Sequence, residues 1–267
     1  LQANIENTDF DKTKSKRKKD GVFYTPEYIT KYIVENTLGK MCFDKREELN
    51  LSNITAPVNP KKLTKVEQQT KDNILIYKDW LFNLKILDPA CGSGAFLNQA
   101  LEYLIKEHKQ LQNDLALMGD LFSSYTVEES VLEHNLYGVD INEDAVEIAK
   151  LSLWLRTAQK GRPLTSLADK IVCANSLLEM PFSENSFDVV IGNPPYVRVQ
   201  GLKSNYEKEA KLYEQKYVSA TGKYDLYALF LEMSFKMLNQ KGKLSYILPH
   251  KFLVIDAGIG LRGFLAE

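Results

Sequence analysis

The sequence lacks the features that mark exported, membrane-spanning and zinc-binding proteins. Its 267 residues include three cysteines, Cys42, Cys91 and Cys173, whose spacing matches neither a disulfide framework nor a zinc cluster. No apolar run reaches the about 18 to 20 residues that a membrane-spanning helix needs, and the polar, basic N-terminus does not resemble a signal peptide. We therefore expect a cytoplasmic protein with no metal site and no membrane partner.

An excess of charge of either sign is also absent. The chain has 34 Lys and Arg residues and 35 Asp and Glu residues, so its formal net charge is -1 and its composition gives no sign of polyanion binding. Residues 1–20 differ, because six basic residues fall between Lys12 and Lys19 with few apolar neighbours. This pattern predicts a flexible basic lead-in, either a solvated linker or, as the alternative, an arm that contacts phosphates.

The remaining residues, 21–267, are expected to form one main domain. Thr25 is expected to cap a helix whose first residue is Pro26, and apolar residues at helical spacing continue up to Gly39. Residues 50–78 are polar and are interpreted as a surface insertion. The chain starts at Leu1 and stops inside a predicted helix over residues 260–266, so we expect a piece of a longer polypeptide.

From residue 84 onward, short apolar strands alternate with longer helices. This alternation predicts an α/β fold with a mostly parallel central sheet and helices on both faces. The predicted strands are Leu84–Asp88, Leu136–Asp140, Asp169–Ala174, Phe187–Ile191 and Lys243–Leu248. The main predicted helices cover residues 96–105, Glu143–Leu155 and Asp225–Asn239.

A glycine-rich turn, Asp88–Phe96, connects the first predicted strand to a helix. Ligands of open α/β sheets bind at the carboxyl ends of strands, near the point where the strand order reverses. Gly92 and Gly94 would let the backbone turn tightly and approach a ligand. The alternative is a purely structural turn.

The second predicted strand ends in Asp140, whose carboxylate could accept hydrogen bonds from both hydroxyls of a ribose. The alternative is a helix-capping or surface carboxylate. The turn lacks the spacing G-x-G-x-x-G, and Asp140 lies 52 positions after Asp88, whereas a nicotinamide dinucleotide site expects about 20. A nicotinamide cofactor is therefore disfavoured.

The segment Phe187–Tyr196 is the most informative part of the chain. It is a buried strand followed by Asn193, Pro194, Pro195 and Tyr196. Prolines fix the backbone and supply carbonyls without N–H donors, so this turn can hold an amine rigidly. A rigid structural turn is the alternative.

Methylation of the exocyclic amine of adenine fits this motif. The amine is a weak nucleophile with two hydrogens, of which the Asn193 side-chain oxygen and the Pro194 carbonyl could accept one each. Tyr196 would stack on the base, and the base would have to be flipped out of the duplex because its amine is unreachable inside it. A strong general base is not required when a sulfonium donates the methyl group.

Together these segments resemble the gamma-group amino-methyltransferases of DNA, particularly those of type II (IIG-like) restriction-modification enzymes. The resemblance extends from Gly21 to Glu267 and includes a Phe-Tyr-Thr-Pro motif that begins at Phe23. It implies a Rossmann-like methyltransferase fold, an N-terminal helical segment, and S-adenosylmethionine as the cofactor. The reaction it implies is site-specific methylation of adenine N6, as the modification part of a restriction-modification system.

The resemblance also implies a set of cofactor-binding residues. They are Phe23, Tyr24, Thr25, Asp88, Pro89, Ala90, Cys91, Gly92, Gly94, Asp140, Ile141, Asn175, Ser176 and Tyr227. For Asn175 a strand-ending turn is the alternative, and a tyrosine stripe that includes Tyr227 could simply be core. The implied catalytic residues are Asn193, Pro194, Pro195 and Tyr196.

The resemblance places three parts of these enzymes beyond Glu267: the last strands, a second base-stacking aromatic residue, and the target recognition domain. The expected partner is double-stranded DNA, bound through a recognition domain outside this chain, and the parent polypeptide is a candidate to carry a nuclease domain. Multi-subunit type I relatives usually have Phe at the position of Tyr196, which favours single-chain relatives.

Two other functions remain open. Enzymes that methylate glutamine in release factors also use Asn-Pro-Pro-Tyr, although they lack the upstream Phe-Tyr-Thr-Pro helix. A non-catalytic nucleic-acid-binding relative is the second alternative, and the presence of the expected reactive residues argues against it.

Overall fold

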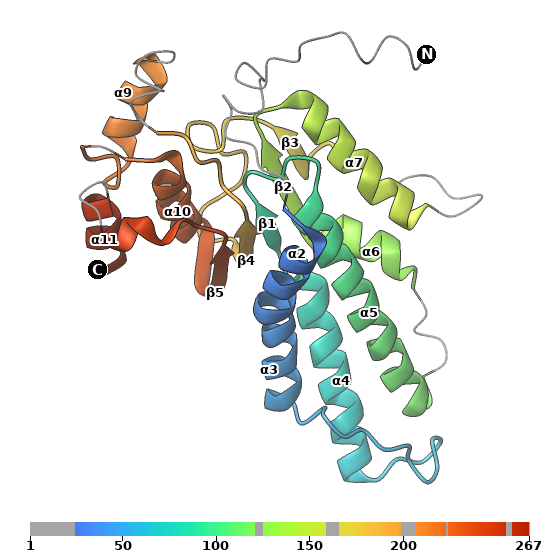
Figure 1. Cartoon of the computed structure of the whole chain (residues 1–267). Helices are drawn as coiled ribbons and strands as arrows, with labels where there is room; N and C mark the ends of the chain where they lie inside the picture. Colours follow the sequence, from blue (N-terminus) through green and yellow to red (C-terminus); the bar gives the residue numbers. More distant parts are fainter. Residues whose placement is uncertain are drawn as a thin grey trace, which may run out of the picture. The chain divides into compact units, whose positions relative to one another are not determined.

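The fold is built around a five-stranded sheet (Figure 1). The computed structural model describes residues 25–120, 125–158, 166–198, 207–222, 224–254 and 258–266. Within them the strand order is β3-β2-β1-β4-β5 and all four neighbouring pairs are parallel, so the predicted parallel α/β sheet is confirmed. The order reverses between β1 and β4. The strands are β1 Ile86–Asp88, β2 Leu136–Asp140, β3 Ile171–Cys173, β4 Phe187–Gly192 and β5 Leu238–Tyr246.

The chain divides into two compact units. The first, called the sheet unit, consists of Thr25–Asn193 and Met233–Ile247 and contains all of the strands above. The second unit includes Pro194–Glu232 and Leu248–Glu267. The predicted boundary between a lead-in and the domain, at residue 20, lies outside the described residues.

Burial of both sheet faces explains why the strands are apolar without alternation. Ile86 pairs with Leu136 on one side and Val189 on the other, and all three belong to the main hydrophobic cluster. Leu87 and Val190, which point to the opposite face, are equally buried. Apolar runs of this kind are typical of parallel strands that are covered on both faces.

Crossover helices connect the parallel strands. Helix α5 (Ala95–Leu117) leads from β1 toward β2, with α6 (Val127–His134) following it, and α7 (Glu143–Thr157) leads from β2 to β3. The apolar stripe predicted on the first of these helices is buried at Phe96, Leu97, Ala100, Leu101 and Leu104. None of the helices in the described ranges is long and apolar enough to cross a membrane.

The remaining helices belong to the later part of the chain. Helix α10 (Leu226–Met237) begins in the second unit and ends in the sheet unit. The second unit also holds α9 (Glu207–Lys216), a 3-10 turn η2 (His250–Leu253) and α11 (Ile259–Ala266), which confirms the predicted final helix.

The N-terminal helical segment is longer than predicted. Helix α2 (Glu27–Val34) continues through a π-helical turn η1 (Glu35–Gly39) into α3 (Lys40–Glu48), so the predicted end at Gly39 is wrong. Gly39 keeps helical backbone angles, and a side chain there would lie 3.2 Å from the ring of Tyr103. The glycine therefore permits close packing and does not end the helix. The predicted capping role of Thr25 is also wrong, because Pro26 is the N-cap and no side chain caps α2.

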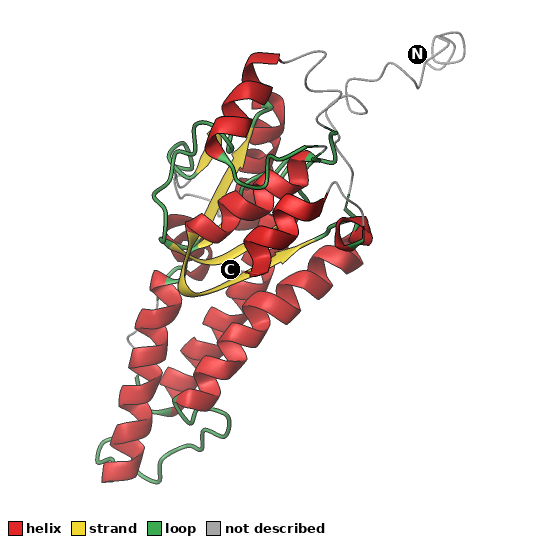
Figure 2. Ribbon diagram, turned by 90° about the vertical axis from the view of Figure 1, so that its left-hand side faces the viewer, coloured by secondary structure: helices red, strands yellow, loops and turns green. Residues whose placement is uncertain are grey.

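The interpretation of residues 50–78 as a surface insertion is wrong for their second half. Helix α4 (Lys65–Asn83) starts there with a capping box between Thr64 and Glu67, and its residues Ile74 and Tyr77 are fully buried. The run looked like an insertion because polar residues cover the exposed face of this helix. Helices α3, α4 and α5 run side by side and extend beyond the sheet (Figure 1 and Figure 2).

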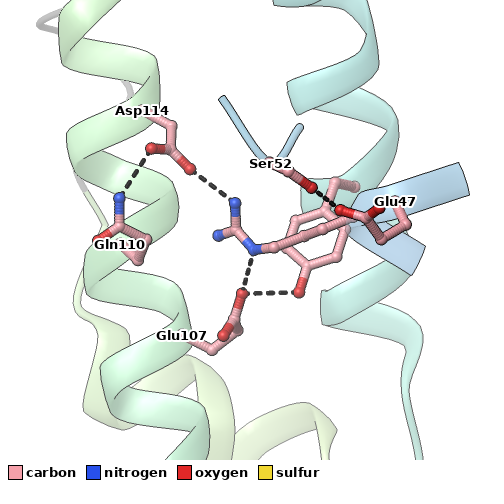
Figure 3. Close-up of polar contacts among 7 residues, drawn as sticks. Glu47, Ser52, Glu107, Gln110 and Asp114 are labelled. Carbon is pink, nitrogen blue, oxygen red and sulfur yellow. Dashed lines mark hydrogen bonds and ion pairs between the residues drawn. The ribbon is translucent and has the colours of Figure 1, made fainter. Parts of the chain in front are cut away.

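A buried charged cluster joins these three helices (Figure 3). The Arg46 side chain on α3 donates from Nε to Glu107 Oε1, 2.5 Å away, and from Nη1 to Asp114 Oδ2, 2.9 Å away, both on α5. The Tyr77 hydroxyl on α4 donates to the same Glu107 oxygen at 2.7 Å, and Gln110 donates to Asp114. Burial opposes the charge of Arg46, but the two carboxylates outweigh it and raise its pKa.

Several strands differ from their predicted bounds. Strand β3 covers Ile171–Cys173, not Asp169–Ala174, and β1 starts at Ile86, not Leu84. Strand β5 begins at Leu238, immediately after α10, whereas the sequence predicts a helix up to Asn239 and a strand over Lys243–Leu248. The residues after Leu238 are polar and mostly exposed, so the first half of β5 has no apolar strand pattern in the sequence. This half of β5 pairs with β4 across a register shift.

Candidate active site

The site is built where the strand order reverses, at the carboxyl ends of β1 and β4. Asp88 is the last residue of β1, and Asn193 follows the last residue of β4, Gly192. Because β1 and β4 are parallel neighbours, the ends of these two strands lie at the same edge of the sheet. The sequence predicted both segments, and the fold brings them to one edge.

The glycine turn leaves an open place on the backbone after β1. Gly92 has a φ of 51°, and a side chain built there would have no atom of the described residues within 4 Å. Gly94 has a φ of 87°, and a side chain there would lie 3.2 Å from the Ala149 Cβ on α7. Gly94 thus allows α5 to pack closely on α7, whereas the backbone at Gly92 is open on its Cβ side. The Cys91 N–H donates to the Val139 carbonyl at 2.9 Å and ties the turn to β2.

Asp140 at the end of β2 holds this turn in place. Its Oδ2 accepts from the Gly92 N–H at 2.8 Å, and its Oδ1 accepts from the Asn142 N–H at 2.9 Å. Asn142, not Asp140, caps α7, through its side-chain oxygen and the Ala145 N–H. The neighbouring side chain, Ile141, is 71% exposed and offers an apolar surface at the same edge.

Asp88 is an acidic group held in an apolar setting. It is 1% exposed and accepts a hydrogen bond from the Ala90 N–H at 3.1 Å. Burial raises the pKa of Asp88 to about 8, and the nearby Asp140 carboxylate adds to the rise. Burial also raises the pKa of Asp140. Two carboxyl groups of this kind favour a cationic ligand, which would stabilise their ionised forms.

Gly192 brings the end of β4 close to the Asp88 carboxyl. A Cβ at Gly192 would lie 2.7 Å from Asp88 Oδ1, so only glycine allows this approach. The Gly192 carbonyl accepts from the Ile247 N–H at 3.2 Å, and Gly192 pairs with Tyr246 of β5. The backbone immediately before Asn193 is therefore held by its pairing with β5.

Asn175 and Ser176 form hydrogen bonds that stabilise the turn after β3. The Asn175 side-chain oxygen accepts from the Leu177 N–H at 3.1 Å, which fits the turn alternative. The buried Ser176 hydroxyl donates to the Pro89 carbonyl at 2.5 Å and joins this turn to the glycine turn. Their contact with a cofactor stays a prediction.

The side chain of Asn193 reaches back to the start of the N-terminal helix. Its Nδ2 donates to the Thr25 hydroxyl oxygen at 3.1 Å, across 168 positions of sequence. Thr25 is itself buried. The sequence predicted both residues in the site but gave no sign of this contact. Phe23 and Tyr24, predicted beside Thr25, lie outside the described residues.

The second unit contains the rest of the Asn-Pro-Pro-Tyr motif, Pro194, Pro195 and Tyr196. The Tyr196 ring lies 6.2 Å from the Tyr227 ring, centroid to centroid, in an edge-to-face arrangement. Tyr227 in turn lies 6.3 Å from Phe252, which the sequence analysis did not single out.

The tyrosines of this unit are closely packed. Tyr224 is 1% exposed and Tyr227 is 3% exposed, as expected of a core stripe. Burial raises the pKa of both Tyr196 and Tyr227 to about 12, so each keeps its hydroxyl proton at neutral pH. Tyr196 is partly exposed and offers the aromatic ring that the motif requires.

Comparison with known proteins gives one family for this chain. Residues 134–267 match the family described as the Eco57I restriction-modification methylase. The type II restriction enzyme and methyltransferase RM.Eco57I of Escherichia coli is 30% identical over 92% of the chain. The adenine-specific methyltransferase BrxX of E. coli O9:H4 is 24% identical over 52% of it.

A solved structure has the same fold. The type IIL restriction-modification enzyme MmeI, determined in complex with DNA, superposes with a TM-score of 0.65 over 94% of the chain at 18% identity. This confirms the predicted Rossmann-like methyltransferase fold. The chain spans 25% of the length of RM.Eco57I, 11% of BrxX and 33% of the MmeI chain.

Proposed function

Because this chain belongs to the Eco57I restriction-modification methylase family, we propose that it transfers a methyl group from S-adenosylmethionine to the N6 amine of a flipped adenine in DNA. The observation that supports this most directly is that Asn193 follows β4 at the same sheet edge as the glycine turn after β1. The electrophile and the amine would meet at this edge.

The residues at this edge fit S-adenosylmethionine. Bare backbone at Gly92 and the acidic pair Asp88 and Asp140 suit a ligand that carries an ammonium and a sulfonium charge. When bound, the cofactor supplies an electrophilic methyl group. The proposed binding residues are Phe23, Tyr24, Thr25, Asp88, Pro89, Ala90, Cys91, Gly92, Gly94, Asp140, Ile141, Asn175, Ser176 and Tyr227.

The amine would be held by acceptors of the Asn-Pro-Pro-Tyr segment. The Asn193 side-chain oxygen and the Pro194 carbonyl would each accept one amine hydrogen, which directs the nitrogen lone pair toward the methyl group. Neutral acceptors suit a nitrogen that becomes positively charged. Stacking of the base on Tyr196 would contribute about 1 to 3 kcal/mol. Pro195 would keep the turn rigid.

Double-stranded DNA is the proposed partner. MmeI, which shares the fold, was determined in complex with DNA, and RM.Eco57I combines a restriction enzyme with a methyltransferase. We propose that a recognition domain outside this chain selects the sequence, that a nuclease accompanies it in the same polypeptide, and that the protein acts in the cytoplasm.

Labelled methyl transfer to DNA tests the proposal. The complete polypeptide that carries this chain is incubated with radiolabelled S-adenosylmethionine and DNA, and the DNA is hydrolysed to nucleosides. We expect label in N6-methyladenine. Label in a release-factor peptide and not in DNA would identify a glutamine methyltransferase, and cofactor binding without any transfer would identify a non-catalytic relative.

Cofactor affinity is expected to rise with pH through about 8. Below this pH the Asp88 carboxyl is protonated, because burial raises its pKa to about 8. A cation stabilises only the ionised carboxylate, so binding must release this proton, which weakens affinity by up to about tenfold per pH unit below the pKa. Dissociation constants for S-adenosylmethionine, measured by calorimetry from pH 6 to 9, test this.

An Asp88→Asn variant is the control for this pH profile. The amino group of the ligand titrates near the same pH, at about 7.7 to 8.0. The contribution of Asp88 is therefore the difference between the profiles of the wild type and the variant. Parallel profiles would show that Asp88 does not ionise when the cofactor binds.

A further inference from the structure

The two ends of an asparagine amide are opposite in chemistry although similar in shape. Only Oδ1 accepts hydrogen bonds and only Nδ2 donates them, and a half-turn about the last side-chain bond exchanges them. An amine substrate needs the oxygen end, because the nitrogen end would place donor against donor. A site that uses Asn193 for this purpose therefore needs something that fixes which end faces the substrate.

In the structure the hydrogen bond from Asn193 to Thr25 holds the amide in one of these two arrangements. Nδ2 of Asn193 lies 3.1 Å from the Thr25 hydroxyl oxygen, so the nitrogen end is turned toward the N-terminal segment and the oxygen end away from it. Thr25 is 7% exposed, so its end of the bond is shielded from competing water.

Both partners of this bond are held by rigid structure. Thr25 precedes Pro26, whose carbonyl accepts from the N–H groups of Ile29 and Thr30 in the first turn of α2. Helix α2 packs on α5, with Val34 fully buried in the main cluster. On the other side, the backbone before Asn193 is held by β5. The geometry of the bond is thus set by the fold and not by a mobile loop.

We infer that Thr25 is a positioning residue that orients the amide of Asn193 with its oxygen toward the substrate amine. This inference rests on the proposed function and adds to it a role for Thr25 that is separate from cofactor contact. In this role the segment before α2 would matter for the reaction, because without the Thr25 hydroxyl the amide of Asn193 loses its defined orientation.

A Thr25→Val variant tests the inference, because valine keeps the shape of threonine and removes the hydroxyl. In the complete polypeptide we expect kcat to fall about tenfold, the effect of one shielded hydrogen bond. Calorimetry of the same variant separates this role from the cofactor contact proposed for Thr25, because the fall in kcat at saturating S-adenosylmethionine should exceed any rise in the dissociation constant. Thr25→Ser retains the hydroxyl and should retain most of kcat. Thr70→Val, on α4, is the matched control for the substitution itself and should behave as the wild type.

Base flipping provides a further readout that does not depend on turnover. The fluorescence of 2-aminopurine at the target position rises when the base leaves the stack, and this rise should be the same in the wild type and in Thr25→Val. An unchanged kcat in Thr25→Val would overturn the inference, as would a weaker cofactor affinity that accounts for the whole loss. Loss of activity in Thr25→Ser as well as in Thr25→Val would also overturn it. Absence of DNA methylation by the wild type would instead refute the proposed function.

Discussion

Replacement of Asn193 by alanine is expected to lower the rate of methyl transfer by about 100-fold to 1000-fold, the usual effect of removing one preorganised hydrogen-bonding group from an active site. The side-chain oxygen is the proposed acceptor for one amine hydrogen, and alanine has none. Cofactor binding should be retained, because Asn193 is not among the residues proposed to hold the cofactor, most of which lie at the ends of β1, β2 and β3. Single-turnover rates with labelled S-adenosylmethionine and calorimetric binding measure the two quantities separately.

A matched control for this variant is Asn83→Ala. Asn83 is exposed at the end of α4, where its amide donates to the carbonyl of Asp79 within the same helix. Its loss should leave both the rate and the cofactor affinity unchanged. If Asn193→Ala abolished cofactor binding, the residue would belong to the cofactor site and the proposed role in holding the amine would be wrong.

The sheet and its site edge were predictable because their signals are local. A buried parallel strand is a short apolar run, and a glycine turn such as Asp88–Phe96 marks the change from strand to helix. β2 was predicted with the bounds that the structure shows, Leu136–Asp140. Once β1 and β4 are neighbours, their carboxyl ends must meet, so the proximity of the glycine turn and Asn193 followed from the fold class.

Features that depend on distant packing were not predictable. The bond between Thr25 and Asn193 joins residues 168 positions apart, and nothing in either local sequence encodes it. Gly39 looks like a helix end because glycine often follows the last turn of a helix, and only the ring of Tyr103 packed against it explains why a glycine stands inside the helix. In each case a tertiary contact outweighs the local preference of the residue.

The acidic pair shows how the fold gives ordinary residues unusual properties. Asp88 and Asp140 each end a strand, and as sequence each could be a surface carboxylate. Neighbouring parallel strands bring them to one edge, where burial raises the pKa of both. The edge is therefore prepared for a cation, at some expense to the stability of the protein without a ligand, which is lost as the pH rises from the ordinary carboxyl pKa to about 8.

Arg46→Met is expected to destabilise the protein by about 3 to 5 kcal/mol, the cost of removing one partner of a buried ion pair. The side chains of Glu107 and Asp114 are 14% and 5% exposed, and each hydrogen bonds directly to Arg46. Methionine fills similar space but leaves two carboxylates without their cation. Urea denaturation followed by circular dichroism measures the change in the free energy of unfolding.

Two further variants test whether unpaired charge causes the destabilisation expected for Arg46→Met. Lys40→Met removes an exposed ion pair with Asp44 on the same helix as Arg46, and should cost less than about 1 kcal/mol. Adding Glu107→Gln and Asp114→Asn to Arg46→Met removes the stranded charges and should restore part of the lost stability. No recovery in this triple variant would mean that packing of the guanidinium against the Tyr77 ring, 4.6 Å from its centroid, matters more than charge.

The same cluster has a consequence for catalysis because of where Arg46 lies. It is on α3, which is continuous through η1 with α2, and α2 begins two residues after Thr25. Loosening Arg46 from α5 therefore frees the helix that presents the Thr25 hydroxyl to Asn193. In Arg46→Met, kcat should fall at temperatures well below the unfolding midpoint, whereas in Lys40→Met it should not. Equal kcat values in the two variants would show that the start of α2 is held without the charged cluster.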